Sequence, residues 1–206
     1  MKIDQLTFKS EKFKVNVSHF RQEEPKGIVI IFPGAGYSHM GPCLYYPSGA
    51  LYNAGYEILN LEYDFRRERL KDNLVETYRE FFQFLYSNLI ELDLPEEKII
   101  LSKSIGTRII GSGDLTNFDK VIWLTPALKD DFVFHSMLEN SHKSLCVIGD
   151  ADPFYERSRV EQFSKEKLET LVINGADHGL DIDSDLNKSL DELKNIISTI
   201  EKFVLK

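Results

Sequence analysis

Short apolar runs recur along most of this sequence, and each one ends at residues typical of a turn. They lie at 27–32, 56–63, 98–102, 120–125, 144–149 and 170–175, and they are rich in β-branched residues. Runs of this length without polar alternation are typical of parallel β-strands that are buried on both faces. This feature restricts the fold most, because both faces of such a sheet must be covered by other elements.

Helical patterns lie between the apolar runs. The segment 67–91 has apolar residues at helical spacing, and 190–204 is amphipathic and can dock on a sheet. The first 20 residues alternate instead, which predicts one or two amphipathic strands in a hairpin at a sheet edge. The expected class is therefore α/β, with a mostly parallel central sheet flanked by helices and N-terminal antiparallel strands at one edge. No linker or internal repeat interrupts 1–206, which predicts a single domain.

Charge and composition narrow the class of partner. The chain has 206 residues, 42% of them hydrophobic, and a net charge of −8, without a run dense in lysine or arginine. That argues against nucleic acid and against an anionic membrane as the main partner. The two cysteines lie far apart, the N-terminus has no apolar signal region, and no stretch approaches the length of a membrane span. We therefore expect a cytoplasmic protein.

The run 27–32 ends in a glycine-bearing turn, PGAGYSHMGPC. A dinucleotide-binding loop would need a third glycine at His39, and a Walker loop would need a lysine at Pro42. Both patterns fail. The glycines can bring backbone N–H groups close to a ligand, although an ordinary strand-to-helix turn explains the same residues equally well.

The run 98–102 leads into the segment SKSIG at 102–106. Small residues at Ser102 and Gly106 permit a sharp strand-to-helix turn that would expose Ser104 at the sheet edge. Ser102 stands where the usual G-x-S-x-G pattern has glycine, so the segment alone also fits a chance turn. Lys103 suggests a serine–lysine dyad, but a neighbour of the central serine should point away from it.

Two later runs also end in residues capable of acid–base chemistry. Asp150 and Asp152 follow the run 144–149, and His178 follows the run 170–175. Each is common in turns when taken alone. Serine, acid and histidine after three candidate strands form a much more specific signal, because sites in open α/β sheets lie at the carboxyl ends of the strands. Three other histidines are interpreted as surface residues: His19, His135 and His142.

These segments resemble the α/β-hydrolase superfamily. The resemblance runs from IVIIFPGAG to INGADHG and rests on FPGAG, SKSIG, VIGDADPF and GADHG. In that family the acid typically follows a late strand as Gly-x-x-Asp-Pro, which favours Asp152 over Asp150. The chain departs from the family at Pro33, where many members have histidine, and at Ser102, where glycine is usual.

The resemblance implies a set of roles for these residues. Ser104 would be the nucleophile, His178 the base, and Asp152 the acid that orients the histidine. The backbone N–H groups of Ala35 and Ile105 would form the oxyanion hole. No cofactor and no metal ion is implied.

The segment 126–143 is too short for the helical cap that many members of that superfamily insert, which predicts a capless enzyme with an open cleft. Gly36 and Tyr37 are candidates to line this cleft. Phe132 and Phe134 either line it or pack into the core as part of a short helix. An open cleft encloses little apolar surface, which favours compact acyl groups.

The expected activity is that of a serine hydrolase, carboxylesterase- or thioesterase-like, which cleaves a small-molecule ester or thioester through an acyl-enzyme. The same triad could instead transfer the acyl group to another alcohol or thiol. The fold could also serve as a non-catalytic binding module. Nothing in the sequence indicates an oligomeric state.

Overall fold

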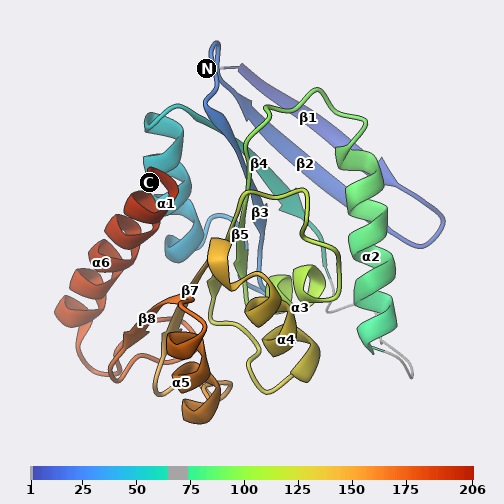
Figure 1. Ribbon diagram of the computed structural model, residues 1–206. Coiled ribbons are helices and arrows are strands. Elements are labelled where there is room, and N and C mark those ends of the chain that lie inside the picture. The colour runs from blue at the N-terminus through green and yellow to red at the C-terminus, as the bar shows by residue number, and fades with distance from the viewer. Residues whose placement is uncertain (1, 65–73) are drawn as a thin grey trace.

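The computed structural model describes residues 2–64 and 74–206 and has one eight-stranded sheet in the order β1-β2-β4-β3-β5-β6-β7-β8 (Figure 1). Six strands from β4 to β8 run parallel, and they confirm the six apolar runs as strands. The strand bounds are β1 Lys2–Lys9, β2 Lys14–Arg21, β3 Gly27–Phe32, β4 Tyr56–Glu62, β5 Lys98–Lys103, β6 Lys120–Leu124, β7 Ser144–Gly149 and β8 Glu169–Ile173.

Helices cover both faces of the sheet, as the α/β class requires. The helices α1 and α6 lie together on one face, and α2, α3, α4 and α5 cover the other (Figure 1). Their bounds are α1 Pro42–Asn53, α2 Leu74–Leu89, α3 Ile105–Gly111, α4 Asp131–Glu139, α5 Arg157–Lys165 and α6 Leu186–Val204. The part of the expected helix 67–91 that precedes Leu74 lies outside the described residues. Among the described residues, no helix is both long and apolar enough to cross a membrane.

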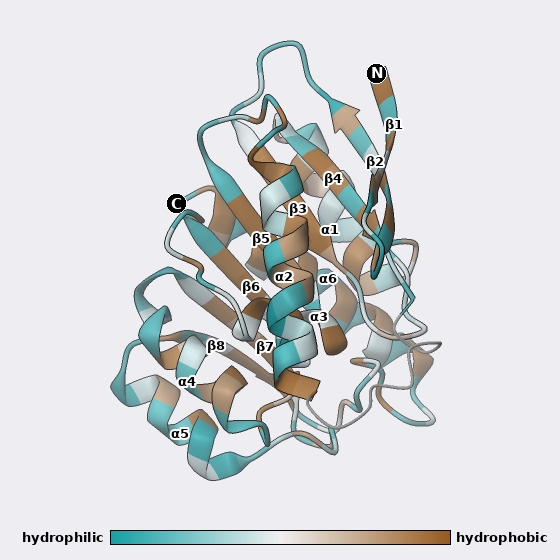
Figure 2. Cartoon of the chain, turned by 90° about the vertical axis from the view of Figure 1, so that its right-hand side faces the viewer, coloured by the Kyte–Doolittle hydropathy of each residue, from teal (hydrophilic) through white to brown (hydrophobic). Residues whose placement is uncertain are grey.

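The central strands are apolar on both sides because each side contributes to a separate core. In β3, Ile28 and Ile30 belong to the core under α2 and α3, while Val29 and Ile31 belong to the core under α1 and α6. The strands in the middle of the sheet are accordingly the most hydrophobic part of the chain in Figure 2. This two-sided burial fixes the sheet and holds the carboxyl ends of its strands in place.

The N-terminal strands form the expected hairpin at one edge. The strands β1 and β2 pair antiparallel, and β2 pairs antiparallel with β4. The interpretation of His19 as a surface residue is wrong: it is fully buried, with Nε2 2.7 Å from Glu57 Oε2. Its place follows from strand alternation, because Val15, Val17 and His19 all point to the covered face of β2. Burial lowers the pKa of His19.

Candidate active site

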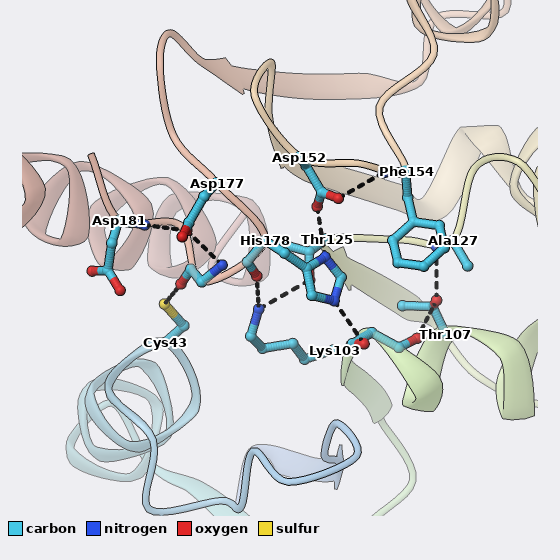
Figure 3. Close-up of polar contacts among 12 residues, drawn as sticks. Cys43, Lys103, Thr107, Thr125, Ala127, Asp152, Phe154, Asp177, His178 and Asp181 are labelled. Carbon is cyan, nitrogen blue, oxygen red and sulfur yellow. Dashed lines mark hydrogen bonds and ion pairs between the residues drawn. The ribbon is translucent and has the colours of Figure 1, made fainter. Parts of the chain in front are cut away.

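Three side chains predicted from the sequence meet at the carboxyl ends of neighbouring strands. Ser104 follows β5, Asp152 follows β7 and His178 follows β8. The Nε2 atom of His178 lies 2.8 Å from Ser104 Oγ, and its Nδ1 atom lies 2.8 Å from Asp152 Oδ2 (Figure 3). The three groups therefore form one hydrogen-bonded chain, with the imidazole between the hydroxyl and the carboxylate.

Ser104 sits on a strained turn between β5 and α3. Its φ of 52° and ψ of −113° lie outside the usual regions for a side-chain-bearing residue. A Cβ atom at Gly106 would lie 2.2 Å from the Phe32 carbonyl oxygen, so only glycine fits two residues after the serine. Ser102 is accommodated where glycine is usual because its Oγ donates to the Ile122 carbonyl at 2.9 Å.

The turn after β3 lies directly against the serine. Gly34 and Tyr37 close it through two backbone hydrogen bonds, and Gly36 supplies the positive φ of 73° that it needs. A Cβ atom at Gly34 would lie 3.3 Å from Ser104 Cβ. Within the described part of the chain, the Ala35 and Ile105 N–H groups donate to no hydrogen bond.

The two candidate acids have different surroundings. The Asp152 side chain is fully buried, and its Oδ1 accepts the Phe154 N–H at 2.8 Å while its Oδ2 faces His178. Asp150 is exposed and accepts the Gly175 N–H at 2.6 Å. Asp152 therefore contacts the histidine, and Asp150 ties together the turns that follow β7 and β8.

Lys103 points away from Ser104, but it still contacts the site. Its side chain is buried, and its Nζ donates to Thr125 Oγ1 at 2.9 Å and to the His178 carbonyl oxygen at 2.8 Å (Figure 3). The ammonium also lies 4.8 Å from the centre of the Tyr37 ring. Burial lowers the pKa of Lys103. This lysine fixes the backbone of His178 relative to β5 and β6, a role that its spacing in the sequence did not indicate.

Phe154 is a further site residue that the sequence analysis missed. Its ring centre lies 5.3 Å from that of His178 (Figure 3). The Arg108 guanidinium lies 5.1 Å from the centre of the same Phe154 ring. Its N–H bond to Asp152, two residues earlier, is the local pattern of an Asx turn. That pattern was the available signal, since it brings the side chain at 154 beside the acid.

Of the two phenylalanines considered for the cleft, Phe134 packs into the core instead. Its ring is buried 5.6 Å from that of Phe163, and the Arg159 guanidinium lies 4.7 Å from its centre. Phe132 is half-buried and packs against the same core. The segment 126–143 thus forms α4 and a short 3-10 turn, and Phe134 does not line a cleft beside Ser104.

A cleft of about 920 Å³ adjoins the glycine turn and extends toward the hairpin of β1 and β2. Gly36 and Tyr37 line it, whereas Ser104 is not among the residues that line it. The other described residues around it are Lys12, Lys14, Asn16, Pro33, Gly34, Ser38, His39, Leu61, Glu62, Tyr63 and Asp64. No group of three or more metal-ligating side chains is found among residues 2–64 and 74–206.

The chain matches no protein-family model and no curated protein. It is similar to many solved structures. Est1E from Butyrivibrio proteoclasticus has a TM-score of 0.70 at 14% identity, covering 98% of this chain and 97% of that one. Dienelactone hydrolase from Anabaena variabilis has a TM-score of 0.68 at 14% identity, covering 99% of this chain and 97% of that one.

A third similar structure is XC6422 from Xanthomonas campestris, described as a serine hydrolase without a lid. Its TM-score is 0.68 at 13% identity, and the match covers 98% of this chain and 94% of that one. At identities this low, the likeness speaks for the fold alone. The chain has the α/β-hydrolase fold, and the resemblance found in the sequence is confirmed at that level.

Proposed function

We propose that the protein is a serine hydrolase that cleaves a small ester or thioester. The observation that carries this proposal is the hydrogen-bonded chain from Ser104 through His178 to Asp152, with both contacts at 2.8 Å. A serine hydroxyl is a weak nucleophile until a base takes its proton, and this arrangement supplies such a base. Several of the similar structures are named as esterases or hydrolases, which agrees with the proposal.

The reaction would proceed in two halves. His178 takes the hydroxyl proton as Ser104 Oγ bonds to the acyl carbon, and the Ala35 and Ile105 N–H groups stabilise the oxyanion. His178 then gives the proton to the leaving alcohol or thiol. In the second half His178 takes a proton from water, which attacks the acyl-enzyme, and returns it to Ser104. Throughout, Asp152 keeps Nδ1 protonated and stabilises the imidazolium.

The proposal is tested with a fluorophosphonate probe and a panel of acetyl and longer esters and thioesters. Wild-type protein should be labelled at Ser104 and should hydrolyse at least one class of ester, while Ser104→Ala should lose both properties. Ser112→Ala is the matched control, because Ser112 lies at the far end of α3 and donates to the Ile109 carbonyl. Folded wild-type protein that takes no label, or takes it at another residue, contradicts the proposal.

A further inference from the structure

A second hollow lies beside α1, on the part of the sheet that this helix leaves uncovered. It is a groove of about 620 Å³ between α1 and the strands β2 and β4. Its walls are largely aromatic and aliphatic, and the residues that matter for the argument are Phe20, His39, Tyr45, Gly49, Ile58 and Asn60. We call it the α1 groove. No described residue that lines it is a lysine, arginine, aspartate or glutamate.

Two buried polar atoms at the α1 groove make no hydrogen bond within the part of the chain that the structure describes. Asn60 is 94% buried, with 6% of its surface exposed, and its Oδ1 makes no hydrogen bond. The Nδ1 atom of His39 is also buried without a hydrogen bond; Glu62 Oε1 is 3.7 Å away. An unsatisfied buried polar group costs about 1–3 kcal/mol. A ligand that reached the Asn60 amide would recover that free energy.

Gly49 leaves open space on the helix side of the groove. It lies inside α1, and a Cβ atom built there would have no heavy atom within 4 Å. Glycine inside a helix costs about 0.5–1 kcal/mol relative to alanine, and no close contact at this position requires it. Nearby, Met40, Tyr45 and Tyr46 expose 61%, 50% and 52% of their surface. The groove is thus open, apolar and unfilled by its own side chains.

We propose that the α1 groove binds a neutral small molecule with a flat aromatic body and a hydroxyl group. Aromatic walls favour a flat apolar body, because rings stack or pack edge to face on one another. The hydroxyl is chosen because it can both donate and accept, and so can pair with either end of the Asn60 amide. A charged ligand would be desolvated without a counterion among the described lining residues.

The groove borders the cleft at the glycine turn. His39 lines both the α1 groove and the cleft at the glycine turn. We assign the groove to a free ligand; a second source, one part of an ester whose carbonyl lies at Ser104, is an outcome of the test. The second source rests on the proposed hydrolase function, whereas binding of the free ligand does not.

Binding is tested directly with 2-naphthol, by titration calorimetry and by saturation-transfer NMR. Wild-type protein should bind it saturably. Gly49→Phe places a ring at the groove, where an added Cβ meets no heavy atom within 4 Å, and should weaken binding at least about tenfold. Gly49→Ala is the control, since one methyl group leaves most of the groove open. Asn60→Leu, of similar size, should weaken binding by a similar factor. Melting temperatures show that each variant is folded.

Two results would overturn the inference: no saturable binding to folded wild-type protein, or equal affinity in wild-type protein and Gly49→Phe. The source of the ligand follows from the ratio of kcat/KM for 2-naphthyl acetate to that for ethyl acetate. A ratio that falls in Gly49→Phe places part of the substrate in the groove. An unchanged ratio, together with 2-naphthol binding that Gly49→Phe weakens, assigns the groove to a separate ligand. If wild-type protein cleaves neither ester, the comparison of 2-naphthol binding between wild type and Gly49→Phe decides whether the groove binds the ligand.

Discussion

Replacing Asp152 by asparagine keeps an acceptor for one of the two hydrogen bonds that its carboxylate accepts and removes the acceptor for the other. Both oxygens accept, one from the Phe154 N–H and one from the His178 ring, each at 2.8 Å. Asparagine has a single acceptor oxygen and an NH₂ group that only donates. If the oxygen keeps the Phe154 N–H, the NH₂ group faces His178 Nδ1. The imidazole then carries its proton on Nε2 and cannot take one from Ser104.

We therefore expect Asp152→Asn to lower the rate of catalysis strongly while it changes the packing around residue 152 little. A change of this kind in a serine triad lowers kcat by about 10⁴, which corresponds to about 5.4 kcal/mol of lost transition-state stabilisation. The assay is steady-state hydrolysis of p-nitrophenyl acetate, with the rate of fluorophosphonate labelling as a second measure. Both rates should fall by similar factors, because both depend on removal of the Ser104 proton.

Asp150→Asn is the matched control, two residues away. Asp150 is exposed and accepts the Gly175 N–H, and an asparagine oxygen can accept the same bond. We expect its kcat to stay within about tenfold of wild type. A kcat for Asp152→Asn within tenfold of wild type, or a larger loss in Asp150→Asn, would refute the assignment of the acid.

Three further predictions concern groups around the site and the sheet edge. Lys103→Met should lower kcat about 100-fold with a smaller change in KM, because the backbone of His178 loses its anchor; steady-state kinetics measure both. Gly106→Ala should lower the melting temperature and slow fluorophosphonate labelling, because the added Cβ meets the Phe32 carbonyl. The lowered pKa of buried His19 means that the unfolded state binds more protons than the native state below about pH 6.5. The contribution of His19 to the free energy of unfolding is complete above that pH. It is lost as pH falls toward the folded-state pKa, by at most about 1.4 kcal/mol per pH unit. Urea unfolding at several pH values should show that the free energy of unfolding falls less with pH in His19→Gln than in wild type.

The strands could be predicted well because the signal for them is local. A strand buried on both faces has to be apolar throughout, so its sequence marks it without reference to the rest of the chain. Helix ends were less accurate. The C-terminal helix begins at Leu186 rather than at 190, because Asp185 caps it by accepting the Lys188 N–H. Leu186 is largely exposed, so its apolar side chain carried no periodic signal there.

The site could be predicted only in part, for a topological reason. Residues that follow parallel strands meet at one edge of the sheet, so Ser104, the pair Asp150 and Asp152, and His178 could be placed together from their positions after the strands. The choice of Asp152 over Asp150 came from the family resemblance. Contacts across that edge depend on side-chain direction. Thus Lys103 was correctly expected to point away from the serine, but its bond to the His178 carbonyl was not foreseen. Phe134 was a candidate for the cleft and lies in the core.

Lys103 also shows how stability and activity can separate at this site. A buried ammonium costs several kcal/mol in lost hydration, which its bonds to Thr125 and His178 and the Tyr37 ring offset in part. Methionine would remove that cost but leave the Thr125 hydroxyl and the His178 carbonyl unsatisfied, at about 1–3 kcal/mol each. These terms oppose each other, so we expect Lys103→Met to change the free energy of unfolding by less than about 2 kcal/mol. The expected 100-fold fall in kcat, about 2.7 kcal/mol, has no opposing term. Loss of activity at nearly constant stability is the signature of a positioning residue; a parallel loss of both would make Lys103 merely part of the core.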